Sequence, residues 1–268
     1  MARSKGKLKI LYVGSSWMTA VTLSSASSFA YDLRGAAVEN TAEPILAAWR
    51  GNPHYEVTYL TSWDALAKFP QTPQALRRYS VVILNDTDSD SLVLYPGDRL
   101  LRTPMGSNRL KSIREYVRCG GALLMVGGYF SFTGRHNAGN FHRTPVEEAL
   151  PVNCLAADDD RVEAPEGVTV EVKQPGHAIM QGIRWRPSPM FTGYNLVQAK
   201  EGAEVLATFK GTVDPAIVVW SYESGRSMAI TTGIAPHWGS SFSQWKYAMR
   251  FLEQALAWLT RRSRAENC

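Results

Sequence analysis

The stretch GGALLMVGGYFSFTG, Gly120–Gly134, decides the fold class of this chain. Ala122–Val126 is an apolar run of strand length, and Gly127 and Gly128 follow it at once. A strand that ends in glycine and turns sharply is typical of the nucleophile elbow of α/β enzymes, because glycine permits strained backbone and close approach. The elbow register puts Tyr129 where such enzymes carry their nucleophile, so an enzyme-like scaffold is predicted with an unusual central residue.

Toward the N-terminus of this stretch, apolar strands alternate with helical segments. The predicted strands are Lys7–Val13, Tyr55–Leu60 and Ser80–Leu84, and the predicted helices are Ala36–Trp49, Gln74–Tyr79 and Asn108–Arg118. The polar segments Gly14–Ser28 and Thr87–Ser107 lack a clear period and are predicted to be loops. Alternation of this kind predicts a parallel sheet with right-handed crossovers.

Toward the C-terminus, the strands follow one another more closely. Thr144 and Glu147, with Pro145 between them, form a capping box that predicts a short helix ending near Leu150. The segment Asp158–Gly167 is predicted to be irregular. The later predicted elements are strands at Val168–Val172, Glu204–Phe209, Ala216–Trp220 and Arg226–Thr231 and a helix at Gln244–Leu259. The sequence thus predicts one α/β domain over residues 7–260, with a mostly parallel central sheet and added antiparallel edge strands.

The net charge of +5 is carried by the two ends of the chain. Residues 1–9 and 261–268 together carry +6, so the remaining body carries −1. Residues 1–6 and 261–268 are expected to be flexible basic tails. Basic tails on a nearly neutral body are a weak footprint for nucleic acid, which we do not expect as a partner. No apolar run approaches the ~18 residues that span a membrane, so no membrane association is expected either.

The three cysteines, Cys119, Cys154 and Cys268, have neither metal-site spacing nor the density of a disulfide framework. This usage predicts a reducing, cytoplasmic environment. Cys119 ends the helix before the elbow strand, on the amino side of the sheet, and is interpreted as a packing residue because active sites lie at the carboxyl side. The run Asp158–Asp160 is expected to form a solvated turn in which Asp159 or Asp160 pairs with Arg161. No metal and no cofactor are predicted.

Four segments directly follow predicted strands, and we expect them to meet in one cleft at the carboxyl edge of the sheet. They are Gly14–Trp17, Asn85–Asp86, Gly128–Ser131 and Gly233–Trp238. The candidate ligand-binding residues in these segments are Ser15, Trp17, Asp86, Gly128 and Trp238.

Three residues of the same cleft are catalytic candidates: His237, Tyr129 and Ser131. His237 lies on a loop fixed by Pro236 and is a candidate general base or ligand contact, the alternative being a structural histidine. Tyr129 is a poor nucleophile at neutral pH and has either a ligand-contact or a packing role. Ser131 would be a nucleophile only if His237 reaches it, and otherwise bonds its own backbone as a turn residue. Asp86 has two readings, orienting a base or ligand and capping the next segment.

Taken together, five motifs resemble the glutamine amidotransferase-like proteins of the class I amidotransferase superfamily, near the trehalose-utilisation type. They are GGYFSFTG at Gly127–Gly134, DDRVEAPEG at Asp159–Gly167, HAIMQGI at His177–Ile183, GYN at Gly193–Asn195 and TTGIAPHWG at Thr231–Gly239. The resemblance spans roughly residues 7–260. It implies a flavodoxin-like three-layer α/β sandwich, typical of bacterial cytoplasmic proteins.

The same resemblance shows where this chain departs from active members, which use a Cys-His-Glu triad. Tyr129 stands at the elbow position of the cysteine, and Gly239 stands two residues after His237, where the glutamate belongs. Only the histidine carries over, so we expect no glutamine hydrolysis by this route, which needs a thiolate activated by its base.

Three functions remain open. The first is an amidotransferase-like domain without glutaminase activity that binds a small polar or sugar-like metabolite at the strand carboxyl edge. The second is a hydrolase or other enzyme that uses His237 with Tyr129, Ser131 or Asp86. The third is a non-catalytic structural or regulatory subunit of an oligomer. A homo-oligomer is expected in any case, because the chain has eight tryptophans, several of them in predicted loops: Trp17, Trp63, Trp185 and Trp238.

Overall fold

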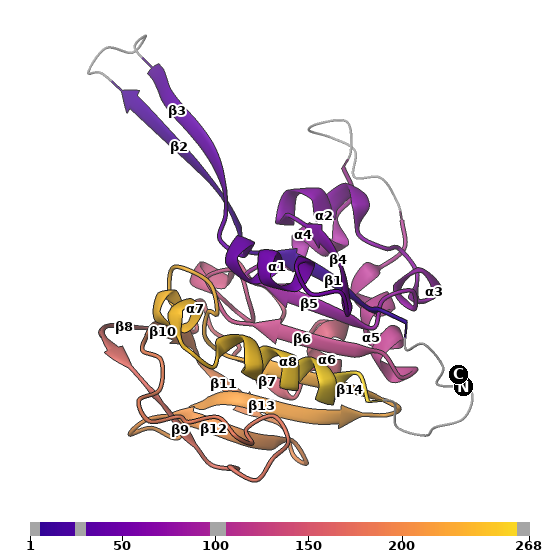
Figure 1. Ribbon diagram of the computed structural model, residues 1–268. Coiled ribbons are helices and arrows are strands. Elements are labelled where there is room, and N and C mark those ends of the chain that lie inside the picture. The colour runs from indigo at the N-terminus through magenta and orange to yellow at the C-terminus, as the bar shows by residue number, and fades with distance from the viewer. Residues whose placement is uncertain (1–5, 25–30, 97–105, 262–268) are drawn as a thin grey trace.

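The computed structural model describes residues 6–24, 31–96 and 106–261. Its centre is an eight-stranded sheet in the order β4-β1-β5-β6-β14-β13-β12-β9 (Figure 1). The strands are β4 (Tyr55–Leu60), β1 (Leu8–Gly14), β5 (Val81–Asn85), β6 (Ala122–Val126), β14 (Gly225–Ile230), β13 (Pro215–Tyr222), β12 (Glu204–Phe209) and β9 (Val170–Val172). Neighbours from β4 to β14 are parallel, and those from β14 to β9 are antiparallel. The prediction of a parallel sheet with antiparallel edge strands is confirmed.

Helices cover both faces of this sheet, because successive strand side chains point to opposite faces. Ile10 and Tyr12 of β1 belong to one buried cluster, and Leu11 and Val13 belong to the other. The helices of the first cluster are α1 (Glu43–Arg50) and α8 (Ala248–Leu259), together with Phe242 of the short helix α7 (Ser240–Gln244). The second cluster includes residues of α2 (Ser62–Lys68), α3 (Pro73–Leu76), α4 (Asp90–Val93), α5 (Arg109–Arg118) and α6 (Pro145–Ala149). The result is a three-layer α/β sandwich.

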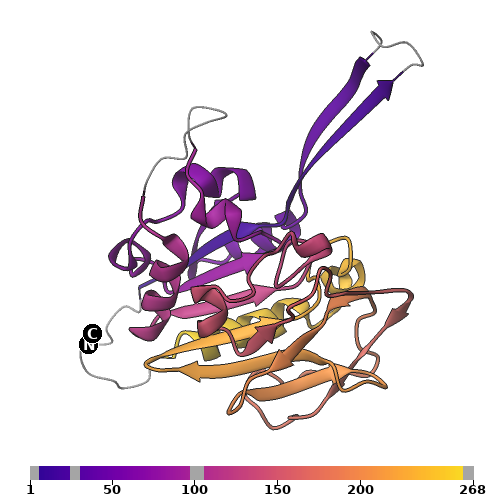
Figure 2. The ribbon, with the colours of Figure 1, turned by 180° about the vertical axis from the view of Figure 1, so that it is seen from behind.

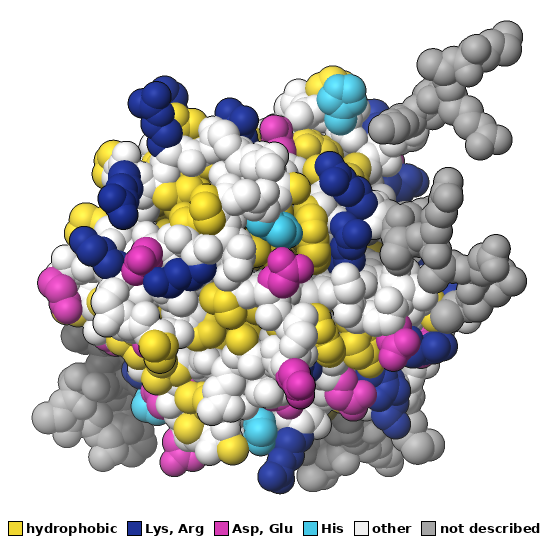
Figure 3. Space-filling model, turned by 90° about the horizontal axis from the view of Figure 1, so that it is seen from below, with side chains coloured by type: hydrophobic (Ala, Val, Ile, Leu, Met, Phe, Trp, Pro, Cys, Tyr) yellow, Lys and Arg dark blue, Asp and Glu magenta, His cyan; other side chains and the backbone are white. Residues whose placement is uncertain are grey.

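Small antiparallel sheets extend this core. One pairs β8 (Arg161–Val168) with β10 (Phe191–Asn195), and another pairs β7 (Val152–Cys154) with β11 (Val197–Ala199). A third, β2 (Ser16–Ser24) with β3 (Tyr31–Asn40), is a long ribbon that projects from the body (Figures 1 and 2). Strands β9 and β12, at the antiparallel edge of the central sheet, lie low in Figure 1. Seen from below, the molecule has hydrophobic side chains through the middle of this face and charged side chains of both signs around them (Figure 3).

Several local predictions were wrong. The segment Gly14–Ser28, expected to be a loop, contains β2. The helix expected over Ala36–Trp49 is the end of β3 followed by α1, because the ribbon pairing overrides the helical propensity of alanine. Asp158–Gly167, expected to be irregular, contains most of β8, where pairing with β10 supplies the backbone hydrogen bonds.

Two further boundaries differ. The strand expected over Val168–Val172 is divided between the end of β8 and β9. The helix expected over Gln244–Leu259 is interrupted, because Trp245 adopts extended backbone angles between α7 (Ser240–Gln244) and α8. Half of the predicted capping box is present: the Thr144 hydroxyl accepts a hydrogen bond from the Glu147 amide at 3.4 Å, but the Glu147 carboxylate accepts from the Arg143 amide and not from the Thr144 amide. Within the described residues no helix is long and apolar enough to cross a membrane. The basic tails fall almost entirely outside the described residues.

Candidate functional site

The elbow follows β6, and its two glycines are required for close approach. A Cβ on Gly127 would lie 2.6 Å from the Thr231 carbonyl carbon, and one on Gly128 would lie 2.2 Å from Asp86 Oδ1. Neither glycine has a positive φ; within the elbow that conformation falls on Phe132, at 55°. Glycine is therefore needed here for space, and the expected strained turn comes later than the glycine pair.

Asn195, at the end of β10, holds the elbow backbone in place. Its Oδ1 accepts a hydrogen bond from the Gly128 amide at 3.0 Å, and its Nδ2 donates to the Gly128 carbonyl at 3.1 Å. Nδ2 also donates to Asp160 Oδ1 at 2.8 Å. The buried Asp160 carboxylate accepts two further bonds, from the amides of Thr133 and Gly134, both at 3.0 Å. Burial nonetheless raises the pKa of Asp160 to about 6.

Asp86, directly after β5, places a carboxylate against the elbow. Its Oδ1 accepts a hydrogen bond from the Phe130 amide at 2.8 Å. Burial raises the pKa of Asp86 to about 7, although hydrogen bonds from the amides of Phe130 and Tyr129 act in the opposite direction. In active elbows, the amide after the nucleophile stabilises the oxyanion of the tetrahedral intermediate. Here that donor, the Phe130 amide, already serves a carboxylate.

Ser131 has a positioning role in this geometry. Its side chain is 1% exposed, and its hydroxyl donates to the Val126 carbonyl at 2.6 Å. The same oxygen accepts a hydrogen bond from the Asp86 amide at 3.1 Å. Both bonds tie the elbow to the ends of β6 and β5, as expected for a serine that bonds backbone in a turn.

Tyr129 keeps its phenolic proton in a hydrogen bond to an acidic partner. The hydroxyl donates to Glu163 Oε1 at 2.9 Å. Burial and then this carboxylate raise the pKa of Tyr129, while Arg161, whose guanidinium lies 4.7 Å from the ring centroid, acts to lower it. The phenol is therefore neutral at physiological pH and is a poor nucleophile.

His237 packs its ring among aromatic side chains at the cleft rim. Its ring lies edge-on to Tyr129 at a centroid distance of 4.3 Å, and its distances to Trp17 and Trp238 are 5.8 and 5.7 Å. The side chain is still exposed at one edge, but loss of water from the packed part lowers the pKa of His237, against the influence of Glu163. The imidazole is thus mainly neutral at pH 7. Its φ of 106° is unfavourable for a side-chain-bearing residue.

The position expected to carry the triad glutamate has no room for a side chain. A Cβ on Gly239 would lie 2.2 Å from the Gly233 carbonyl oxygen, and the Gly239 amide donates to the Ala235 carbonyl at 3.0 Å. The loop backbone would have to move before any glutamate could stand beside His237. Replacing Gly239 by glutamate alone would therefore not restore the triad, because the conformation of the loop also excludes that side chain.

Glu163 and Arg161 are functional candidates that the sequence analysis missed. Glu163 accepts from Tyr129, from Arg161 Nη1 at 3.0 Å and from Trp238 Nε1 at 3.2 Å, so one carboxylate orders three side chains beside the cleft. Trp238 itself is 2% exposed. The expected pairing of Arg161 holds for Asp159, at 2.8 Å, but Asp160 is buried beneath the elbow and is not part of a solvated turn. The alternation of charged and apolar residues in Arg161–Glu163 was the available signal for a strand.

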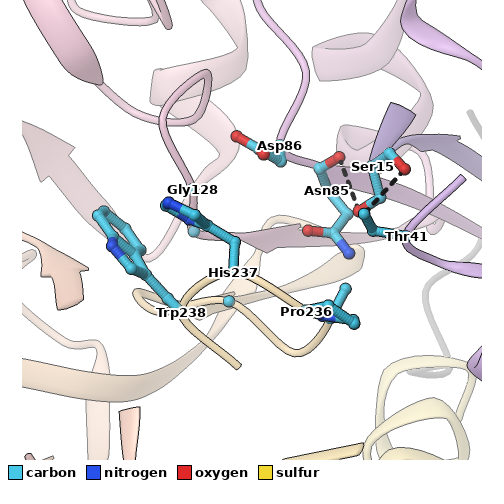
Figure 4. A pocket seen from close by; sticks show the side chains of 11 residues that line it. Ser15, Thr41, Asn85, Asp86, Gly128, Pro236, His237 and Trp238 are labelled. Carbon is cyan, nitrogen blue, oxygen red and sulfur yellow. Dashed lines mark hydrogen bonds between the residues drawn. The ribbon is translucent and has the colours of Figure 1, made fainter. Parts of the chain in front are cut away.

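The four strand-end segments do meet at one edge of the sheet (Figure 4). Ser15, Asn85 and Thr41 lie on one side of a hollow, and Asp86 and His237 lie on the other, with Trp238 beyond them. The hollow encloses about 10 Å³, which is room for one water molecule. Trp17 packs beside His237, which lines the hollow, and its ring centroid is 5.8 Å from that of His237 and 5.4 Å from that of Phe130. Any larger ligand must therefore sit over the mouth, against the aromatic rim formed by Trp17, Tyr129, Phe130, His237 and Trp238.

The remaining candidates lie elsewhere. Cys119 caps the C-terminal end of α5, at the opposite edge of the sheet, as the sequence predicted. Its thiol contacts Glu115 Oε1 at 3.3 Å. Cys154 is buried, and burial raises the pKa of its thiol well above the ordinary value. The described residues contain no group of three or more His, Cys, Asp or Glu side chains placed to hold a metal ion.

A mostly parallel sheet, an elbow after β6 and a histidine loop after β14 define an α/β protein of the class I glutamine amidotransferase-like type. The family model described as "Putative glutamine amidotransferase" matches residues 9–261, and the chain belongs to this family.

Solved structures agree with this assignment. The chain is 31% identical to the cytoplasmic protein STM3548 of Salmonella typhimurium, with a TM-score of 0.85 over 94% of this chain and 99% of that one. It is 33% identical to the cytoplasmic protein STM1381 of Salmonella typhimurium LT2, with a TM-score of 0.83 over the same shares. A ThuA-like protein of Bacteroides uniformis shares the fold at 13% identity, with a TM-score of 0.56 over 100% of this chain and 97% of that one. Comparison with curated proteins gave no significant match.

Proposed function

We propose that this protein binds a small polar, sugar-like metabolite over the mouth of the strand-end hollow and does not hydrolyse glutamine. The observation that carries the proposal is the Asp86 carboxylate on the Phe130 amide, at 2.8 Å. An acyl-transfer elbow needs that amide free for a developing oxyanion. A carboxylate in its place presents hydrogen-bond acceptors, which suit a ligand rich in hydroxyl groups.

The aromatic rim supports the same class of ligand. Trp17, Tyr129 and His237 offer ring faces and edges around the mouth, and the apolar C–H faces of a sugar pack well against such rings. Glu163 and Arg161 next to Tyr129 add polar groups at the margin. A rim of this kind binds by contact over the opening and needs no deep cavity, in keeping with the volume of about 10 Å³ below it.

A titration calorimetry screen of neutral mono- and disaccharides and polyols tests this proposal. Trp17→Ala is expected to weaken binding of the best ligand at least about tenfold, equivalent to about 1.4 kcal/mol. Trp63→Ala is the matched control, because Trp63 is 76% exposed and lies on α2, outside the rim. Failure of every neutral sugar and polyol to bind below about 10 mM, or equal losses in the two variants, would refute the proposal.

One observation favours a second candidate, an enzyme that uses Asp86 and His237 as an acid–base pair. Asp86 and His237 both line the hollow, and burial raises the pKa of Asp86 to about 7 while it lowers the pKa of His237, a combination typical of acid–base pairs. If the bound metabolite is also converted, Asp86→Asn abolishes turnover even at ligand concentrations that saturate the variant. If the protein only binds, no product forms over hours in the presence of the ligand identified by calorimetry.

We further propose that the protein is cytoplasmic and forms a homo-oligomer, as a regulatory or structural subunit would. Two relatives described as cytoplasmic support the location. The projecting β2–β3 ribbon supports the assembly: Met18 and Val38, which pair across it, are 69% and 71% exposed. A two-stranded ribbon is marginally stable alone in water, and a second copy of the chain would cover it.

A further inference from the structure

A groove of about 680 Å³ lies between the edge strand β9 and the segment Trp185–Met190, and it shares no lining residue with the strand-end hollow. Its volume falls within the range of small-molecule sites, roughly 300–1,000 Å³. The residues that line it are Thr169, Val170, Glu171, Val172, Trp185, Arg186, Pro187, Ser188, Met190 and Lys210.

The wall of the groove is apolar and held in place. Trp185 packs against Trp245 and Phe251, with ring centroids 4.8 and 5.5 Å apart. The Met190 amide donates to Ser241 Oγ and its carbonyl accepts from the same hydroxyl, both at 2.8 Å. The Met190 side chain is nevertheless 50% exposed. A fixed backbone that leaves a flexible thioether on the surface is suited to packing against an apolar ligand.

The edge of β9 offers backbone groups to the same space. On the side that faces β12, the Thr169 carbonyl accepts a hydrogen bond from the Lys210 amide at 2.9 Å, and the Lys173 amide donates to the Leu206 carbonyl at 2.8 Å. The Val170 amide points the opposite way and donates to Ser188 Oγ at 3.2 Å. Because N–H directions alternate along a strand, the Val172 amide also points to the groove. β9 has only three residues, about 10 Å of edge, which suits a small molecule better than an extended peptide.

The charges that border the groove are unbalanced. Within the described part of the chain, neither Arg186 nor Lys210 makes a side-chain hydrogen bond or ion pair with another residue. The one acidic residue of the lining, Glu171, is already paired with Lys173 at 3.1 Å. Two unpaired cations beside an apolar wall are complementary to a ligand with one anionic end and an apolar body.

We propose that this groove binds a small organic anion, a carboxylate or phosphate monoester on an aromatic or aliphatic body. The anionic group lies between Arg186 and Lys210, and the body packs along Val170, Trp185 and Met190. The proposal is independent of the metabolite site at the strand ends, since it uses none of the same residues.

Calorimetric titration of the whole chain with phenylacetate, octanoate and phenyl phosphate tests the proposal, with phenylacetamide and octanamide as uncharged counterparts. We expect at least one of the three anions to bind with saturation below about 10 mM, and the matching amide, where there is one, to bind at least about tenfold more weakly. The double variant Arg186→Gln/Lys210→Gln is expected to lose about tenfold in affinity for that anion. The double variant Arg77→Gln/Lys111→Gln, which removes two exposed cations near α3 and on α5, is the control with matched charge and is expected to bind as the wild type does.

The outcomes separate clearly. Equal affinity for an anion and its amide, or equal losses in the two double variants, shows non-specific binding and overturns the proposal. So does the absence of saturation for all three anions. Trp17→Ala, the rim variant, is expected to leave the affinity for these anions unchanged, so failure of the sugar-binding proposal does not affect this result.

Discussion

Replacement of Asp86 by asparagine changes how stability depends on pH. In the folded protein the Asp86 carboxyl has a pKa of about 7, against 3.8 for an unperturbed aspartate as in the unfolded chain. Folding therefore favours the protonated form of this carboxyl. The corresponding contribution to stability is fully present below pH 3.8 and is lost as pH rises through about 7. Wild-type protein therefore carries the full cost of burying this carboxyl at pH 8, and about a third of that cost at pH 5.

The size of this effect follows from the shift. About three pKa units correspond to about 4 kcal/mol as an upper limit, at 1.36 kcal/mol per unit. Asp86 retains some exposure to solvent, so we expect roughly 2 kcal/mol. Asparagine keeps an acceptor for the Phe130 amide and carries no charge, so the variant avoids the cost at pH 8.

Urea unfolding of both proteins at pH 5 and pH 8 measures the effect. The free energy of unfolding of Asp86→Asn, relative to wild type, is expected to rise by about 1.2 kcal/mol from pH 5 to pH 8, because only the part of the shift that lies between pH 5 and about 7 falls in this interval. The difference between variant and wild type cancels the pH dependence of the other groups, including the lowered pKa of Asp159. Asp64→Asn is the control, since that carboxyl has a lowered pKa and an exposed partner in Lys68. A variant that is equally affected at both pH values, or more destabilised at pH 8, would show that the carboxylate is not held in this environment.

Further predictions concern the elbow, the histidine loop, a buried arginine and assembly. Asn195→Ala is expected to lower the free energy of unfolding by about 3 kcal/mol, because it removes both side-chain hydrogen bonds to the buried Gly128 peptide and one of the three that Asp160 accepts; urea unfolding with an unchanged midpoint would contradict this. His237→Gly is expected to stabilise the fold by about 1 kcal/mol through relief of its positive φ while weakening metabolite binding; a destabilised variant would mark the histidine as structural. Arg109 is fully buried and donates to four backbone carbonyls, so Arg109→Ala is expected to cost about 3 kcal/mol in thermal or urea unfolding, and a change below about 1 kcal/mol would refute this. Light scattering after size exclusion is expected to give an oligomer mass at tens of micromolar, and a monomer mass would leave the ribbon without its proposed partner.

The central sheet was predictable because its strands are short apolar runs bounded by turn residues. Ala122–Val126 is buried at every position, as its composition indicates. The β2–β3 ribbon was not predictable in the same way. Its two strands pair with each other and are not part of the central sheet, so neither needs one apolar face. The sequence of the ribbon therefore shows no strict alternation of apolar and polar residues.

Part of the candidate site could be predicted from the sequence, and part of it could not. The strand-end segments could be grouped because the carboxyl ends of parallel strands share one edge of a sheet. Glu163 and Asn195 could not be placed there, because they come from the small β8–β10 sheet, whose position depends on packing against the elbow. The lack of space beside Gly239 is likewise a property of the folded loop, although the absence of the glutamate could be read from the sequence.

Glutamine hydrolysis is the most direct measurement of the central claim, that the elbow of this protein is not a glutaminase centre. Purified protein is incubated with glutamine at pH 7 to 8, and glutamate and ammonia are both quantified against a protein-free control. The Tyr129 phenol bound to Glu163, the occupied Phe130 amide and the closed space at Gly239 predict no release above that control. Stoichiometric release of glutamate and ammonia that is lost in Tyr129→Phe, Cys119→Ser or Cys154→Ser would contradict the account and identify the nucleophile.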